Sequence, residues 1–465
     1  MSPPAPGRRR AGRGGSRGTR TGPTTRRERP VPHPPSAAPP PPTGAAALPE
    51  RPAPSVELHV RTGAAGWEAG GHAGTAARTG PPAALVLARS AASLRRPDAR
   101  GEDQLWESAH WTSPLCPLAA PATELVVSWN ADVPRGCWLR VEVLATRSDG
   151  RRTPWLPLAD WAATDEDIAP ASAAPTGDDV VTADTDTLAV RAAAAARGLR
   201  ITALRLRLTL CRRPGSTAVP AVRRLAVAAA ALPERETVPP SPPGPASGVE
   251  LSVPPLSQYA HEGRYPHYNG GGAAWCSPTS LRMVLAAHGR HPDRAALAWV
   301  EPGHEDPDVC HAARRTYDHR WGGCGNWPFN TAHAAVHRGM NAVVTRLESL
   351  TAAEGLIGAE LPLITSQSFE ESELPGAGYA TAGHLMVVSG FTADGDVVAH
   401  DPAGRSRAAV RRVYPRRAFE TVWLRTRRTR ADGSVGTGSG GVCYVLWPEE
   451  ADARQRRALA AVGVR

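Results

Sequence analysis

The sequence contains no lysine and no long apolar run, and the two absences bear on different properties. All 54 basic residues among the 465 are arginine, and glycine and proline together account for 92 residues. This usage indicates a GC-rich genome more than a physical requirement of the fold. No run of 18 or more apolar residues occurs, so we expect no membrane-spanning helix. No apolar segment follows the arginines at 8–10, so we expect no secretory signal, and the compartment stays open.

The positive net charge is concentrated at the N-terminus. The chain carries +10 at pH 7, and residues 1–30 hold nine arginines against a single acid, Glu28. Only about +2 remains for the rest of the chain, and a nearly neutral body does not match the electrostatic footprint of a nucleic-acid-binding protein. We therefore expect no nucleic-acid partner for the folded part.

The first 55 residues are rich in arginine, glycine and then proline, with four consecutive prolines at 39–42. Such a segment buries too little apolar surface to offset its ordering entropy, and we predict that residues 1–55 are disordered. A tail that binds nucleic acid or membrane and a wrongly assigned start codon are the alternatives.

Alternating apolar and polar residues begin at Val56. Residues 56–61 and 203–210 follow a strict period of two, and residues 124–129 and 138–144 are further apolar runs bounded by turn residues. Several short alternating strands separated by polar turns predict an all-β sandwich.

This region is also rich in tryptophan. Buried tryptophans would be core residues, whereas exposed ones would form a platform for a sugar ring, and we expect the buried arrangement. The six side chains in question are Trp106, Trp111, Trp129, Trp138, Trp155 and Trp161.

A proline-rich segment separates two regions of different composition. Residues 233–248 contain six prolines, and proline at this density favours an extended, semi-rigid spacer. The predicted organisation is a disordered tail (1–55), a β-sandwich domain (56–232), a Pro-rich linker (233–249), an α+β domain (250–450) and a C-terminal tail (451–465).

A glycine-rich loop ends at Cys276, directly before a helical pattern. Apolar residues recur at helical spacing over 281–288, and Gly289 is placed to end the helix. Ser277 suits the N-cap and Pro278 the first helical position. A thiolate at the positive end of a helix is stabilised, which makes Cys276 a candidate nucleophile. An ordinary buried cysteine is the alternative.

His384 opens a strand-like apolar run, and a second such run ends at Asp401. The dipeptide Asp394–Gly395 between them predicts a hairpin. A histidine that opens one strand and an acid that ends the next can meet at one end of a sheet, where the acid would orient the imidazole. A satisfied core histidine and a turn acid are the alternatives, and His400 is a weaker competitor for the role of base.

The register of this hairpin does not by itself bring the two residues together. A two-residue turn pairs Val388 with Asp401 and leaves His384 four positions away. A β-bulge near Gly390, or a bend after Asp401, must close that gap.

Residues 250–448 resemble the double-glycine-peptidase-like cysteine peptidases, a papain-like group that includes the bacteriocin-leader processing domains. The resemblance rests on three blocks: VPPLSQY with WCSPTSLRMVLAAHG, then GHLMVVSGF with DGDVVAHDPAG, then VYPRRAFETVW with VCYVLWP. The segment TSPLCPLAAPATELVVSWNA is similar to the sandwich domain that precedes this domain in some actinobacterial proteins.

The resemblance implies a papain-like α+β domain and assigns a role to each motif residue. Cys276 is the nucleophile, His384 the general base, Asp401 its orienting acid, and Gln258 a donor to the oxyanion. It implies a peptide or protein substrate, no metal or cofactor, and an extracytoplasmic location. Ser277 stands where the family usually has glycine, and the long loop between Gln258 and Cys276 makes the glutamine assignment less secure.

Two cysteines lie in a histidine-rich stretch at 301–330 that looks like an insertion. Cys310 and Cys324 have His304, His311 and His319 near them in sequence, but no pair has the CxxC-like spacing of a four-ligand zinc site. We therefore expect free thiols, with a Cys310–Cys324 disulfide as the alternative.

The sequence supports three hypotheses about function. The first is a thiol-dependent hydrolase of peptide bonds that uses Cys276, His384, Asp401 and Gln258. The second is an inactive peptidase-like binding protein whose sandwich domain holds a cell-wall or glycan ligand. The third is an amidase or transferase that uses the same residues on a non-protein amide. The arginines at 411–412 and 416–417 would favour an acidic substrate if they faced the site. We expect instead that they are exposed to solvent.

Overall fold

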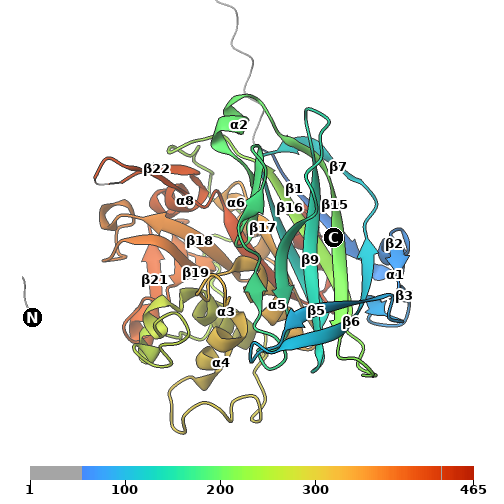
Figure 1. Ribbon diagram of the computed structural model, residues 1–465. Helices are drawn as coiled ribbons and strands as arrows, with labels where there is room; N and C mark the ends of the chain where they lie inside the picture. Colours follow the sequence, from blue (N-terminus) through green and yellow to red (C-terminus); the bar gives the residue numbers. More distant parts are fainter. Residues whose placement is uncertain (1–54, 431, 465) are drawn as a thin grey trace, which may run out of the picture. The chain divides into compact units, whose positions relative to one another are not determined.

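The computed structural model describes residues 55–430 and 432–464, which form a strongly β-rich N-terminal region and a C-terminal α+β region (Figure 1). The predicted disordered tail lies outside these residues except for Ser55, where the first strand begins. No described helix is long and apolar enough to cross a membrane.

The N-terminal region consists of two large antiparallel sheets. The first has the order β12-β13-β14-β8-β16-β4-β3, with β1 beside β16, and the second has the order β11-β10-β9-β15-β6-β2, with β5 beside β6 and β7 beside β15. The first sheet comprises β1 (Ser55–Thr62), β3 (Thr75–Arg78), β4 (Ala84–Leu87), β8 (Glu124–Asp132), β12 (Thr176–Gly177), β13 (Val181–Asp184), β14 (Thr187–Val190) and β16 (Ala221–Ala231). The second comprises β2 (Gly71–Ala73), β5 (Ala92–Pro97), β6 (Asp103–Thr112), β7 (Cys116–Ala122), β9 (Cys137–Arg147), β10 (Leu156–Trp161), β11 (Ala171–Ser172) and β15 (Ile201–Arg212). Two short helices, α1 (Gly63–Glu68) and α2 (Ala192–Ala196), accompany them.

Side chains from both sheets fill one hydrophobic core. The alternation seen at 203–210 places the leucines of β15 inward, and they pack with apolar residues of β8 and β16 from the other sheet. Five of the six tryptophans named above are fully buried, and Trp155 is covered by the guanidinium of Arg207, so they do not form an exposed aromatic platform.

The C-terminal region is built on one sheet with the order β17-β24-β18-β19-β20-β21 and a two-stranded ribbon, β22-β23. The strands are β17 (Met340–Arg346), β18 (Leu363–Phe369), β19 (Thr381–Phe391), β20 (Val397–His400), β21 (Arg411–Tyr414), β22 (Arg427–Thr429), β23 (Val435–Thr437) and β24 (Val442–Pro448). The helices are α3 (Cys276–Ala287), α4 (Pro307–Thr316), α5 (Trp327–Val336), α6 (Leu350–Ile357), α7 (Arg407–Val410), α8 (Arg416–Leu424) and α9 (Ala453–Ala461), with short 3₁₀ turns η1 (Gln258–His261), η2 (Gly272–Ala274) and η3 (Glu371–Glu373).

The proline-rich segment forms neither helix nor strand between residues 232 and 249, but it is packed along the C-terminal region. Val238 and Ala246 are buried, and the backbone N–H of Ala246 donates to Glu354 at 3.1 Å. The segment is thus a proline-rich connection without regular secondary structure that packs against the C-terminal region. The exact domain limits stay a prediction.

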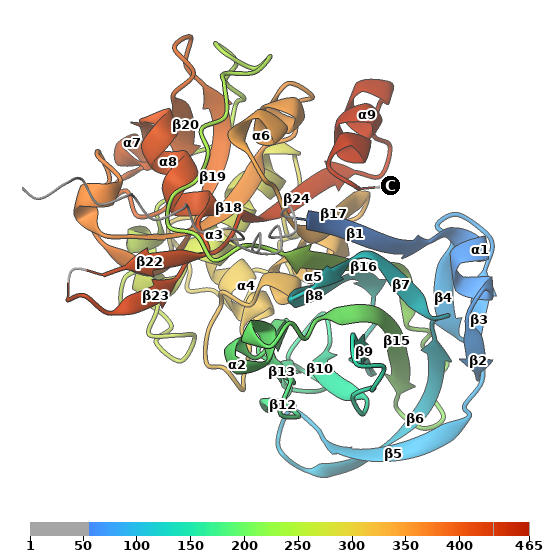
Figure 2. The same ribbon diagram turned by 90° about the horizontal axis from the view of Figure 1, so that it is seen from above.

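Helix α5 joins the cores of the two regions. Phe329 and Ala332 of this helix pack into the core of the N-terminal sheets, and the Phe329 ring meets Trp129 edge-on at 6.2 Å. Figure 2 shows α5 and β17 where β8 and β16 of the N-terminal region reach the C-terminal sheet.

The outer edge of β17 is capped by side chains of β8 rather than by another strand. The Asn130 amide donates to the Ala342 carbonyl at 2.7 Å and accepts from the Ala342 N–H at 3.2 Å, while Ser128 Oγ accepts from the Val344 N–H at 3.2 Å. Asn130 and Ser128 are fully buried, so these bonds replace the ladder partners that a buried sheet edge requires.

We expect Asn130→Ala to destabilise the protein by about 1–3 kcal/mol, because it leaves the buried N–H and C=O of Ala342 without partners. Chemical denaturation followed by tryptophan fluorescence measures this effect. Asn341→Ala is the matched control, since Asn341 lies next to Ala342 in β17 and has no side-chain hydrogen bond among the described contacts, and its loss should change stability far less. Equal effects from the two variants would refute the role of Asn130.

Candidate active site

Cys276 is the first residue of α3, so the helix begins earlier than the sequence indicated. Trp275 is the N-cap, and the prediction that Ser277 caps the helix is wrong. Ser277 lies inside the first turn, where its hydroxyl shares a 3.0 Å hydrogen bond with Tyr444 of β24 and its backbone N–H bonds the Cys276 thiol. Cys276 still sits where the backbone N–H groups of a helix are free to stabilise negative charge.

The glycine-rich loop lets the chain pass close behind Cys276. A Cβ on Gly272 would lie 2.2 Å from the carbonyl oxygen of Gln258 and 2.5 Å from the carbonyl carbon of His261. Only glycine fits there. The close approach packs η1, which starts with Gln258, against the residues that lead into the helix.

His384 lies in β19 and bonds the other two members of the predicted set. Its Nε2 is 2.8 Å from Asp401 Oδ1, and the imidazole is also hydrogen-bonded to the Cys276 thiol. The structure thus brings Cys276, His384 and Asp401 together in one place.

The hairpin that joins His384 to Asp401 differs from the predicted one. A two-residue turn is wrong: the Thr392 N–H donates to the Asp396 carbonyl at 2.8 Å, so the loop is longer, and Val388 pairs with Ala399 instead of Asp401. The ladder has a bulge between Val388 and Gly390, as the predicted geometry demanded. The longer loop and the bulge together bring His384 within bonding distance of the acid.

Asp401 is buried and held by four donors. Besides His384, it accepts hydrogen bonds from Tyr379 at 2.8 Å, from Tyr414 at 2.7 Å and from the Ala403 N–H at 2.9 Å. The Tyr379 ring also meets the His384 ring edge-on at 5.5 Å. Tyr379 lies outside the blocks quoted above, and Tyr414 lies in the VYPRRAFETVW block without a predicted role in the site. Only their position on the loop before β19 and at the end of β21 brings them to the acid.

The charges of the three side chains support one another. Burial raises the pKa of the Cys276 thiol, but the charge and hydrogen bond of His384 and the N–H groups of Leu385 and Ser277 outweigh it, and the net shift is downward. Burial lowers the pKa of His384, yet Asp401 and Cys276 together raise it to about 10. Against its own burial, Asp401 has its pKa held well below the ordinary value by His384 and the other donors. The geometry thus favours a thiolate–imidazolium pair.

Gln258 lies beside Cys276 in the same cleft. Its side chain is buried, and the amide nitrogen donates to the Ala273 carbonyl at 2.7 Å. That bond uses one of the two amide hydrogens, and the second remains for a ligand. His400, the weaker candidate for the base, bonds Ser389 at 3.0 Å and does not line the cleft.

Cys276, His384 and Gln258 line a cleft of about 860 Å³ that both regions build, and Asp401 lies buried behind His384. The turn between β13 and β14 contributes Asp184, Thr185 and Asp186 from the N-terminal region, and Trp321 and Trp327 contribute apolar surface. Burial raises the pKa of Asp186 to about 6.

No arginine is among the described residues that line this cleft. Arg411 pairs with Glu250, Arg416 pairs with Glu354, and Arg412 and Arg417 bond backbone carbonyls, so these arginines do not support an acidic substrate.

Gln367 is a cleft residue that the sequence did not indicate. It lies in β18 directly opposite His384, it is almost fully buried, and neither atom of its amide has a hydrogen-bond partner. A buried amide without a partner at the wall of a cleft is a polar group available to a ligand. Its place in an otherwise ordinary strand gave no sequence signal.

All seven cysteines are free, so the Cys310–Cys324 disulfide considered from sequence does not form. Cys310 and Cys324 are both buried.

Comparison with known proteins identifies both regions. Residues 57–230 match the Peptidase C39 N-terminal domain, and residues 250–431 match the Peptidase_C39 like family. A C39-like peptidase from Bacillus anthracis is similar among solved structures, with 18% sequence identity over 43% of this chain and 96% of that chain and a TM-score of 0.27. No curated protein matches this chain. In chain order, the protein therefore has a region that matches the C39 N-terminal domain, followed by a region that matches the C39-like peptidase family.

We expect Cys276 to react with iodoacetamide at a lower pH than free thiols do, because His384 lowers its pKa. Above about pH 10 His384 loses its proton, and the thiolate–imidazolium pair is lost. Replacing His384 by alanine removes the lowering contributions of the imidazole, so His384→Ala should restore the pH dependence of an ordinary thiol. The measurement is the labelling rate at Cys276 against pH, followed by mass spectrometry.

His400→Ala is the matched control for this experiment, since His400 is buried in the neighbouring strand but bonds Ser389 instead of the thiol. Ordinary thiol behaviour of the unaltered protein would show that the thiolate–imidazolium pair is not present.

Proposed function

We propose that the protein is a cysteine peptidase that hydrolyses peptide bonds with Cys276, His384, Asp401 and Gln258. The observation that carries the proposal is the hydrogen-bonded series Cys276–His384–Asp401 at the wall of a cleft next to an available glutamine amide. The match of residues 250–431 to the C39-like family also supports a peptidase. We also propose that the N-terminal sheets form a sandwich and that the C-terminal domain has a papain-like arrangement.

The proposed reaction is acyl transfer to sulfur followed by hydrolysis. The Cys276 thiolate attacks the scissile carbonyl carbon, and negative charge moves to the carbonyl oxygen. The free N–H of Cys276 at the helix terminus and the second N–H of Gln258 stabilise that oxyanion. The His384 imidazolium gives its proton to the amine as the C–N bond breaks, which leaves a thioester on Cys276 and a neutral imidazole.

Water completes the cycle. The neutral His384 takes a proton from a water molecule, whose oxygen attacks the thioester carbon, and the C–S bond breaks to release the acid and the thiolate. Asp401 keeps its charge throughout: it holds the imidazole orientation and stabilises the imidazolium. The complete and fully bonded set favours this activity over the inactive binding protein.

We propose that Gln367 bonds the substrate main chain and that the acidic turn selects substrates with a basic group. An extended peptide presents N–H and C=O groups that an unpartnered amide can bond, and Gln367 lies directly across the ladder from His384. The described residues that line the cleft include Asp184 and Asp186 but no arginine. This negative charge favours a ligand that carries an arginine, a lysine or a free amino group.

Gln258→Ala should lower kcat by about 10²–10³-fold with a small change in KM, because the lost donor acts on charge that develops in the transition state. Cys276→Ala should abolish turnover. Steady-state hydrolysis of a peptide library measures both.

Tyr259→Phe is the matched control, since Tyr259 neighbours Gln258 in η1 and in the cleft but has no assigned role. A Gln258→Ala enzyme that keeps its kcat while Cys276→Ala is inactive would remove Gln258 from the mechanism. A panel of non-peptide amides in the same assay distinguishes a peptidase from an amidase.

Asp184→Asn should lower kcat/KM by about two- to fivefold for substrates with arginine or lysine, as expected for an exposed charge pair. The same variant should leave kcat/KM unchanged for neutral analogues of equal length. Asp179→Asn, an exposed acid nearby that does not line the cleft, is the control. An equal loss on basic and neutral substrates would contradict a charge-based preference.

A further inference from the structure

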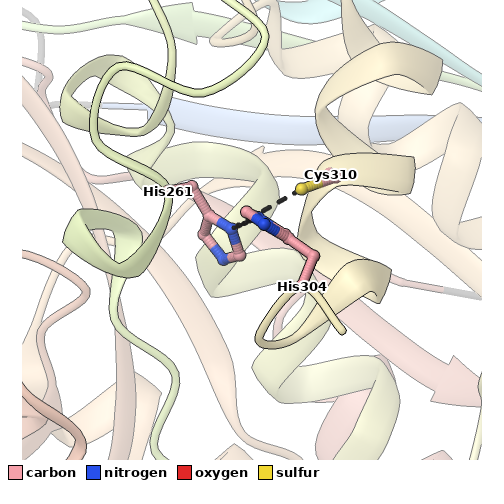
Figure 3. Close-up of side chains that lie close together, drawn as sticks. All are labelled: His261, His304 and Cys310. Atoms are coloured by element: carbon pink, nitrogen blue, oxygen red, sulfur yellow. Dashed lines mark hydrogen bonds between the residues drawn. The ribbon is translucent and has the colours of Figure 1, made fainter. Parts of the chain in front are cut away.

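Three potential metal ligands meet on the side of η1 away from the cleft. His261 ends η1, His304 lies in the loop before α4, and Cys310 lies in α4. Their ligand atoms all lie within 4.8 Å of one another, and His261 and Cys310 are fully buried (Figure 3). None of the three lines the catalytic cleft.

Hydrogen bonding alone does not satisfy this cluster. His304 Nε2 is 2.8 Å and Cys310 Sγ is 3.5 Å from the same atom, His261 Nδ1, as the two dashed lines in Figure 3 show. That nitrogen has either one lone pair or one proton, so it cannot make a full hydrogen bond with both neighbours. A cation among the three atoms would accept a lone pair from each of them.

We propose that His261, His304 and Cys310 bind a divalent metal ion of the zinc type. Imidazole nitrogen with thiolate sulfur is a typical zinc ligand set. A tetrahedral zinc site separates two nitrogens by about 3.3 Å and nitrogen from sulfur by about 3.6 Å. The His261–Cys310 separation already fits, and His304, which is partly exposed in a loop, has to withdraw by about half an ångström.

The fourth ligand position is open to solvent or to Asp306. This residue begins α4, and one of its carboxylate oxygens bonds Arg407 while the other is buried without a hydrogen-bond partner. Its charge acts on the Cys310 thiol, so the two groups are close.

Binding is balanced by the release of one proton. Burial and the nearby His304 lower the pKa of His261 to about 4, so its imidazole is neutral and ready to ligate. Burial raises the pKa of Cys310 to about 12, and the thiol therefore gives its proton to solvent when the metal–sulfur bond forms.

The ion would connect the 301–330 segment to the part of the active site that contains Gln258. His261 is the last residue of the turn that Gln258 begins, and its ring lies 5.8 Å from that of Trp275, the residue before Cys276. His261, His304 and Cys310 would then be positioning residues, a consequence that rests on the proposed function, whereas metal binding itself does not.

The test uses the full chain with Cys276→Ala, which removes the catalytic thiolate as a competing ligand. Protein purified without chelators is analysed for metal content, then stripped and titrated with Zn²⁺ and with Co²⁺. We expect about one ion per chain, a thiolate-to-cobalt charge-transfer band and a higher melting temperature with Zn²⁺. Cys310→Ser should abolish the charge-transfer band, and His304→Asn should weaken binding by about tenfold or more.

Cys324→Ser is the matched control, because Cys324 is equally buried but lies outside the cluster. Circular dichroism reports the folding of each variant. His304 is partly exposed, so His304→Asn tests the site without a change in the core. No cobalt–thiolate band, or a band that survives Cys310→Ser, would overturn the site. Because every readout is made on a protein without Cys276, a failure here is separate from a failure of the proposed hydrolysis.

Discussion

The buried carboxylate of Asp401 is the constraint that the rest of the site depends on. A charge without solvent is costly unless several donors compensate it, and here the donors come from different segments: the loop before β19, β19 itself, the turn after β20, and β21. The acid therefore fixes the relative positions of those segments. It fixes His384 first, and His384 in turn determines the charge state of Cys276.

The N-terminal and C-terminal regions depend on each other in a comparable way. β17 would expose an unpaired edge if Asn130 and Ser128 did not cover it, and α5 completes the core of the N-terminal sheets with Phe329. Because the two regions share buried groups at this junction, the β13–β14 turn is held at the rim of the cleft. A domain that appears from its sequence to be a separate module thus takes part in building the site.

The sequence pattern predicted those structural features that depend on residues close together along the chain. Helical spacing after Cys276 and alternation in β15 identified those elements. The register of the hairpin predicted either a bulge near Gly390 or a bend after Asp401, and the ladder contains the bulge. The helix start was missed because Trp275 caps α3 without a side-chain hydrogen bond, so no capping residue marks it.

Other members of the site have no local signal. Tyr379 and Tyr414 bond Asp401, and Gln367 lies opposite His384, only after the sheet forms. The cluster of His261, His304 and Cys310 has no local signal either, since His261 is 43 residues away from His304 and joins it only through the turn that Gln258 begins.

The negative charge of the cleft wall has two opposing effects. A wall with Asp184 and Asp186 attracts a cationic ligand, but the same negative potential disfavours a thiolate at Cys276. The Cys276 thiolate is stabilised by groups on its own side: the His384 charge, two backbone N–H groups and the helix terminus. Burial raises the pKa of Asp186 to about 6, so mild acid neutralises this carboxylate while His384 stays charged. The attraction for a basic ligand should therefore weaken as the pH falls through about 6, whereas His384 stays protonated throughout that range.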